Sequence, residues 1–262
     1  LFFESNYIKG YTLDFVQIKY RQELFNGLET FAKIGYEKRS ALFNNDNHYY
    51  INNKEKQYSS NNPLAPEDFS TKSVDQHQVF KSQITARIVF GQKYVSIPDR
   101  KINIGNERYP RIDVTLENGF GASKRGFNYS QLRTEIYQNF SVANKGDFYY
   151  RLKAGTFFSA DDISFIDYQR FNGNQTQIGT KANYTNVFNT LPYYDFSTNK
   201  SYLEGHIEHD FKGWILGKIP GVNTLNFNLV FGAHLLASQE RKPYSEFSIG
   251  IDNLGFGKYR LL

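Results

Sequence analysis

The chain has 262 residues, no cysteine, no methionine and a formal net charge of +5. Without cysteine it can hold neither a disulfide scaffold nor a thiolate metal site, and thiol catalysis is excluded as well. Lys and Arg are spread singly along the chain instead of forming one basic stripe, so the positive charge predicts no nucleic-acid partner. Aromatic residues make up 17% of the chain, with 20 Tyr and 24 Phe, yet no run of about eighteen apolar residues predicts a transmembrane helix.

Apolar and polar residues alternate with a period of two in segments that recur along the whole chain. In residues 80–90, for example, Ile84 and Ile88 share one face, while Lys81 and Arg87 lie on the other. This period is typical of β-strands that separate an apolar from a polar environment. In chain order, the segments with this pattern are residues 16–24, 28–36, 80–90, 112–116, 129–140, 148–156, 201–211, 227–235 and 247–251. We therefore predict an all-β chain of about ten antiparallel strands.

The connectors between these segments alternate in length. Asn26-Gly27 and residues 143–146 make short turns, whereas residues 44–77 and 159–200 form long polar excursions. Alternate strands of an antiparallel meander reach opposite ends, so both long excursions leave the strands at the same end. Long loops at one end and short turns at the other predict an antiparallel transmembrane outer-membrane β-barrel with long extracellular loops.

A β-sandwich also has antiparallel strands with one wet face, and it is the alternative fold. Three features favour the membrane barrel. The predicted strands run about nine to thirteen residues, which suits a tilted membrane crossing. Their polar faces are strongly charged, as with Arg111 and Asp113 on one strand. Tyr and Phe also gather at strand ends, as at Tyr149-Tyr150, where an aromatic girdle would meet the lipid headgroups.

Several stretches resemble one family of outer-membrane proteins. They read RQELFNGLET, KYVSIPDRKINIGNERYP, DISFIDYQRFNGNQ, LPYYDFSTNKSYLEGHIEHDFKGWILGKIP and PYSEFSIGIDNLG, and they cover most of the chain. The chain is similar here to Bacteroidota carboxypeptidase-regulatory-like-domain proteins, whose C-terminal barrel is a domain of unknown function. The resemblance implies that residues 1–262 are a C-terminal barrel domain, which we expect to be incomplete and to follow an N-terminal β-sandwich domain upstream. It implies no catalytic residue.

Two histidines and three acids fall within residues 201–211, SYLEGHIEHDF. On a helix His206 and His209 would share a face, but a strand sorts the segment almost cleanly into polar and apolar sides, so we predict a strand. Glu204, His206 and Glu208 then follow one another on the polar side, about 7 Å apart. A metal or proton site would need a further ligand from a neighbouring strand. We favour a charge-paired wall that binds no metal.

The same period divides the other strands into an interior and a lipid-facing side. The polar residues that we predict to face the lumen are Arg87, Arg133, Glu135, Glu204, His206 and Glu208. The apolar residues that we predict to face lipid are Ile84, Ile88, Leu132, Ile136, Leu203 and Ile207. We expect no cofactor.

Three connectors carry further patterns. Residues 91–110 are too elaborate for a simple turn, and they either form an extended rim loop or fold into the lumen or dock a periplasmic partner. In residues 212–225 we favour a short amphipathic helix with Trp214 at the membrane interface, over a strand-end aromatic anchor. The Asn-Gly pair within residues 170–174 predicts a turn, and we favour loop packing over sugar binding by Tyr168 and Phe171.

No catalytic motif is present. The sequence lacks a paired-carboxylate, nucleophile-elbow or phosphate-loop pattern, and Ser201 and His209 are too far apart on one strand to hydrogen-bond. We expect a non-enzymatic outer-membrane protein that is a structural or accessory component of an envelope assembly. Its expected partners are outer-membrane lipid, lipopolysaccharide and other envelope proteins. The alternative is a transport barrel, either a solute channel or the partner of an energised import system.

Overall fold

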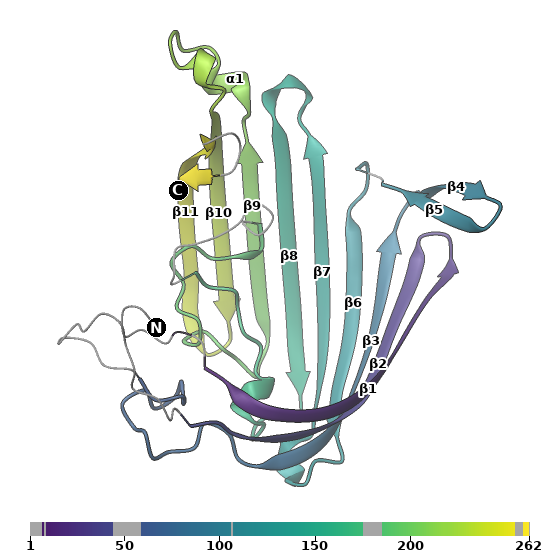
Figure 1. Cartoon of the computed structure of the whole chain (residues 1–262), viewed down its shortest axis with the longest axis vertical. Coiled ribbons are helices and arrows are strands. Elements are labelled where there is room, and N and C mark those ends of the chain that lie inside the picture. Colours follow the sequence, from purple (N-terminus) through teal and green to yellow (C-terminus); the bar gives the residue numbers. More distant parts are fainter. Residues whose placement is uncertain are drawn as a thin grey trace.

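One curved antiparallel sheet organises the chain (Figure 1). The computed structural model describes residues 7, 9–43, 59–105, 107–174, 185–254 and 259–261. Ten strands pair in the order β1-β2-β3-β6-β7-β8-β9-β10-β11-β12 within this described part. Their bounds are β1 Tyr11–Phe25, β2 Leu28–Ala41, β3 His77–Val89, β6 Arg111–Phe120, β7 Tyr129–Ser141, β8 Asp147–Phe158, β9 Tyr202–Asp210, β10 Asn228–Ser238, β11 Arg241–Asn253 and β12 Tyr259–Leu261.

The prediction of an all-β antiparallel architecture is confirmed, but the sheet is not closed. Each strand pairs with its neighbour along the chain, as in an up-and-down meander. Within the described residues no pairing joins β1 to β12, so these two strands are the edges of the sheet. The observed fold is therefore a curved ten-stranded sheet with two open edges in the described part of the chain. Among the described residues, no helix is both long and apolar enough to pass through a membrane.

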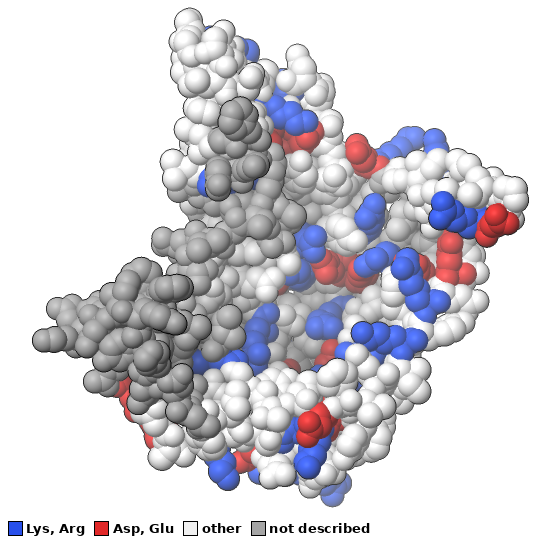
Figure 2. Space-filling view, in the orientation of Figure 1, with Lys and Arg blue, Asp and Glu red and all other residues white. Residues whose placement is uncertain are grey.

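The two faces of the sheet differ in chemistry because the strands keep the period-two pattern. The convex face carries large apolar side chains that are each at least 38% exposed: Ile84, Leu132, Leu152, Leu203 and Ile207. The concave face carries the charged residues, which line a hollow in the molecular surface (Figure 2). An exposed apolar surface of this extent, opposite a charged one, is what an interface with lipid or another apolar partner requires.

The short connectors lie at one end of the sheet. The β1–β2 turn uses Asn26-Gly27, where Gly27 has a φ of +86° and an added Cβ would lie 2.4 Å from the Val89 carbonyl oxygen. Only glycine fits this position, for two reasons. Residues with a side chain rarely adopt this left-handed backbone conformation, and a Cβ would collide with the neighbouring strand.

The connector between β3 and β6 forms a two-stranded hairpin, β4 (Lys93–Ile97) and β5 (Arg100–Ile104), which projects away from the sheet (Figure 1). All residues of its two strands are exposed. It therefore follows the predicted rim-loop arrangement and does not enter the hollow. Its base contacts the β1–β2 turn, where the Asn26 side chain donates to the Gln92 carbonyl oxygen at 2.7 Å, and Lys101 of β5 pairs with Glu23 of β1.

The segment after β9 contains the short helix that we predicted around Trp214. Helix α1 (Gly213–Leu216) is a single turn, and a 3₁₀ turn η5 (Asn223–Leu225) follows it. Two glycines and Pro220 lie within or next to α1, and these residues disfavour a continuous helix.

The long connectors lie at the opposite end. The first, residues 42–76, is described from residue 59 onward, and the predicted excursion over residues 44–58 lies outside the described residues. The second, which we call the interior loop, comprises residues 159–201, of which 159–174 and 185–201 are described. It folds back over the concave face and builds an apolar cluster in which Phe171, Phe188 and Leu191 pack on Tyr202 and Leu236. The predicted loop packing of Phe171 is thus observed.

Candidate functional site

Ion pairs connect neighbouring strands across the concave face. Arg87 of β3 donates two hydrogen bonds to Asp113 of β6, at 2.9 and 2.7 Å. Arg133 of β7 pairs with a carboxylate of β6, Glu117, at 3.2 Å. Side chains that project from the same face of adjacent strands lie close enough for such pairs. The concave wall therefore satisfies these charges internally.

The series of pairs continues toward the C-terminal half of the sheet. Glu135 of β7 pairs with Arg151 of β8. Lys153 of β8 lies 3.0 Å from Glu204 of β9. Glu208 accepts a hydrogen bond from Arg260 of β12 at 2.7 Å. All six residues that we predicted to face the lumen lie on the concave face, and whether that face encloses a lumen remains a prediction.

His206 occupies the most buried position of the candidate metal segment. Its Nε2 lies 2.7 Å from Glu204, and its Nδ1 lies 2.7 Å from Nδ1 of His234 on β10. In these contacts His206 Nε2–H donates to the carboxylate, and one of the two Nδ1 atoms donates to the other. Phe188 of the interior loop covers the pair, with its ring centroid 4.7 Å from that of His206. In the described part of the chain, no group of three or more His, Cys, Asp or Glu residues could hold a metal ion.

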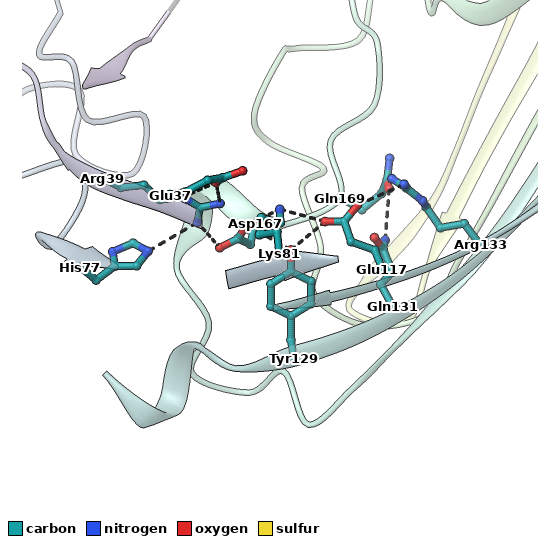
Figure 3. Close-up of polar contacts among 10 residues, drawn as sticks. All are labelled: Glu37, Arg39, His77, Lys81, Glu117, Tyr129, Gln131, Arg133, Asp167 and Gln169. Carbon is teal, nitrogen blue, oxygen red and sulfur yellow. Dashed lines mark hydrogen bonds and ion pairs between the residues drawn. The ribbon is translucent and has the colours of Figure 1, made fainter. Parts of the chain in front are cut away.

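A buried carboxylate fixes the interior loop to the far side of the sheet (Figure 3). Asp167 belongs to a 3₁₀ turn of the loop, η3 (Phe165–Asp167). Arg39 of β2 donates to it at 2.6 Å, Lys81 of β3 at 3.0 Å and the Tyr129 hydroxyl of β7 at 3.1 Å. We call these four residues the anchor cluster.

The anchor cluster is closed off from solvent. The side chains of Asp167 and Arg39 are each 2% exposed, and that of Lys81 is 16% exposed. Each cation also has a second carboxylate partner: Glu37 pairs with Arg39, and Glu117 pairs with Lys81. A buried charge is tolerated when it has such partners, so the cluster forms a connected network across β2, β3, β6 and β7.

Electrostatics keep Asp167 ionised in this setting. Burial alone would raise the pKa of Asp167, but the charges of Lys81 and Arg39 outweigh burial, and the pKa is lowered from its ordinary value. The loop is therefore held by a carboxylate that stays charged at neutral pH.

Neighbouring loop residues extend the contact along the wall. The Tyr202 hydroxyl donates to the Gln169 side-chain oxygen at 3.0 Å, and Gln131 donates to the same oxygen at 3.3 Å. The two arms of the loop pair through Gln169 and Thr198, whose backbone hydrogen bonds measure 2.9 and 3.0 Å. Between this loop and the wall lies a polar cavity of about 500 Å³, whose lining includes Arg87, Arg133 and Lys153.

Trp214 lies in α1, at the end with the short connectors. Its ring stacks on Phe211 with centroids 6.0 Å apart, and the ammonium groups of Lys145 and Lys218 lie 5.6 and 4.8 Å from its ring centroid. An aromatic ring beside basic side chains is the arrangement found at membrane interfaces, and the interfacial position of Trp214 remains a prediction.

The sequence analysis singled out none of the four anchor residues as a site. One signal was available: Asp167 is an acid that directly follows the apolar residues Phe165 and Ile166. An acid among apolar neighbours marks a position that will be buried and needs a cationic partner.

Comparisons with known proteins place the chain in a family. The model described as "Family of unknown function (DUF5686) C-terminal domain" matches residues 1–251. The chain belongs to this family. The match covers the part that we predicted to be a C-terminal domain, while the carboxypeptidase-regulatory-like relationship and the Bacteroidota source remain expectations.

No curated protein matches the sequence of this family member. A solved structure of BamA from Haemophilus ducreyi lacking POTRA domains 1-3 is similar to it with a TM-score of 0.39 and 9% sequence identity. The similarity covers 91% of this chain and 55% of the BamA chain, so the chain spans little more than half the length of that protein.

We predict that Asp167→Asn frees the interior loop. The substitution should lower the free energy of opening the loop by about 3 kcal/mol. This value is near the lower limit for removing one partner of a buried ion pair, because Arg39 and Lys81 keep their second carboxylates. Hydrogen exchange of backbone amides in residues 159–174 should then accelerate about 100-fold. Asp161→Asn is the matched control, since Asp161 pairs with Lys200 in the same loop and is 80% exposed. Asp161→Asn should leave the exchange rates essentially unchanged because this pair is exposed to solvent, and equal effects of the two variants would contradict the anchoring role.

We also predict how the anchor depends on pH. The pKa of Asp167 is lower in the folded than in the unfolded protein, so its stabilisation is fully present above the unfolded Asp value of about 3.9. It is lost as the pH falls through the folded value. The difference in loop protection between the wild type and Asp167→Asn should therefore persist at about pH 5 and shrink only below about pH 4. Loss of this difference already near neutral pH would show that another group controls the loop.

Proposed function

We propose that the chain forms an outer-membrane β-barrel domain that is a non-enzymatic structural or accessory component of an envelope assembly. The observation that carries this proposal is the anchored interior loop, which crosses the charged concave face and is fixed there by Asp167. A barrel whose interior holds a fixed loop is suited to a structural role and not to free passage of solute. The apolar convex face supports contact with outer-membrane lipid and lipopolysaccharide, with other envelope proteins as further partners.

The non-enzymatic part of the proposal rests on the state of the polar side chains. On the concave wall, Arg87, Glu135 and Glu204 all have ionic partners. His206 is directed at Glu204 and His234 and is 0% exposed, so it is closed to substrate. Catalysis needs a reactive group that substrate can reach.

A transport barrel is the second candidate function. The polar cavity between the interior loop and the wall favours it, because its volume of about 500 Å³ would suit a small polar solute. A solute channel or the partner of an energised import system would need the loop to move away from Arg39 and Lys81.

Replacing Ile84 with Arg should impair membrane insertion. Ile84 lies in the middle of β3 on the convex face and is 53% exposed. A charged side chain facing the bilayer midplane costs about 2–4 kcal/mol in outer-membrane barrels. Gln83→Arg places the same side chain on the adjacent residue but on the concave face, and it should fold into lipid vesicles as efficiently as the wild type. Equal yields of folded protein for the two variants would exclude membrane placement of the convex face.

Ion conductance separates the two candidate functions. The full-length protein in planar bilayers should give no steady conductance if the anchored loop blocks the interior. Asp167→Asn should produce intermittent openings, because the loop loses its anchor, while Asp161→Asn should behave as the wild type does. Stable conductance steps from the wild-type protein would overturn the structural role and support the transport barrel.

A further inference from the structure

A second cavity, separate from the anchor cluster, lies in the interior loop. It has a volume of about 500 Å³, and its lining includes Tyr7, Arg170, Phe171, Asn172, Tyr193 and Tyr194. We call it the tyrosine pocket. The backbone N–H of Lys9 donates to the Tyr194 hydroxyl at 2.8 Å, so the pocket lies between the segment before β1 and the loop. Both segments join strands at the end with the long connectors.

Three tyrosines give the pocket aromatic walls of different orientation. The rings of Tyr7 and Tyr193 are 6.3 Å apart and inclined by 66°, and those of Tyr193 and Tyr194 are 6.4 Å apart and inclined by 70°. The rings meet at steep angles, so aromatic surfaces of different orientation bound the pocket. The electron-rich face of an aromatic ring attracts the weakly positive C–H groups of a saccharide ring.

The charge in the pocket comes from Arg170. Its guanidinium lies 5.6 Å from the Phe165 ring centroid and 5.8 Å from that of Tyr194, and these two rings hold it in place. Among the described residues, Arg170 forms no ion pair, in contrast to Arg39, Arg87, Arg133 and Arg151.

The hydrogen-bonding capacity of Arg170 is also underused. The side chain donates one long hydrogen bond, of 3.4 Å, to the Phe165 carbonyl oxygen, and its buried Nε has no hydrogen-bond partner. A guanidinium carries five N–H donors in a planar fork that matches a carboxylate or a phosphate. The terminal nitrogens of this group, which the two rings hold in position, can donate to an acidic acceptor in the pocket.

We propose that the tyrosine pocket binds an acidic saccharide. The sugar ring lies against Tyr193 and Tyr194, and its carboxylate or phosphate accepts hydrogen bonds from Arg170. A neutral sugar would use the aromatic walls but leave the guanidinium without an acceptor, and an acyl chain would bury that charge unpaired. The volume is within the usual range for a small-molecule site. This inference goes beyond the proposed function, because binding to the purified protein does not depend on whether the interior conducts.

The test is calorimetric titration of the purified full-length protein in detergent with two matched probes. Trigalacturonate carries a carboxylate on every ring, and α-1,4-galactotriose is its neutral counterpart. The wild type should bind the acidic probe at least about tenfold more tightly, as expected when a guanidinium bonds a carboxylate. Discrimination of less than about twofold, or no binding of either probe at about 10 mM, would overturn the proposal. This comparison needs no variant.

Variants then locate the site. Arg170→Gln should weaken binding of trigalacturonate about tenfold or more and leave galactotriose unchanged. Arg125→Gln is the matched control, because Arg125 is exposed in a turn at the same end of the sheet, and it removes the same charge. Tyr193→Ala should weaken the binding of both trigalacturonate and galactotriose. If Arg125→Gln weakens trigalacturonate as much as Arg170→Gln does, the attraction is general and the pocket is not the site.

A further pair of probes distinguishes the two sources of the negative charge. Mannose 6-phosphate and mannose differ by one phosphate, as galacturonate and galactose differ by one carboxylate. Tighter binding of the phosphosugar would identify a phosphorylated sugar such as those of lipopolysaccharide, and tighter binding of the uronate would identify an acidic polysaccharide. Equal binding of each acid and its neutral partner would again count against the role of Arg170.

Discussion

The carboxylate of Asp167 sets the arrangement of the concave side of the molecule. It is buried, so it requires positive partners, and the only way to reach Arg39 and Lys81 is to carry the interior loop across the sheet from β8 to β2. Removing the carboxylate and two cations from water costs free energy that their mutual attraction offsets only with good geometry and further hydrogen bonds. Glu37, Glu117 and Tyr129 provide those bonds. The path of the first arm of the loop follows from this requirement, while the apolar cluster packs the loop on Tyr202 and Leu236.

The charged wall and the apolar outer face are two results of the same strand period. Alternate side chains of a β-strand point to opposite faces of the sheet. Charged residues at every second position therefore gather on the concave face. These ions need partners or water, and the cross-strand pairs such as Arg87–Asp113 supply the partners. The opposite face is mainly apolar along the middle of the strands, and Ile84 and Leu203 remain exposed on it. A molecule with this contrast is stable only where the two faces meet different surroundings.

Local patterns predicted the strands well because the period of two is a property of neighbouring residues. The segment with His206 formed a strand, as its alternation required, although its partner His234 could not be named before the register of β9 and β10 was known. The predicted short helix around Trp214 is present, and two glycines and a proline limit it to one turn. Arg39 and Asp167 are 128 residues apart, and nothing in either local sequence reveals which distant side chain will be its partner. The anchor cluster was missed for that reason.

The sequence distance across the anchor also bears on the order of folding. Closing a contact between residues 128 positions apart requires a large loss of chain entropy, and that loss is compensated only after the intervening strands have paired. The sheet from β2 to β8 must therefore exist before Asp167 finds Arg39 and Lys81. We therefore expect the contacts of the interior loop with Arg39 and Lys81 to form late in folding, across strands that have already paired with their neighbours. Once formed, these contacts connect the loop after β8 directly to β2 and β3, so we expect the strands between them to unfold together.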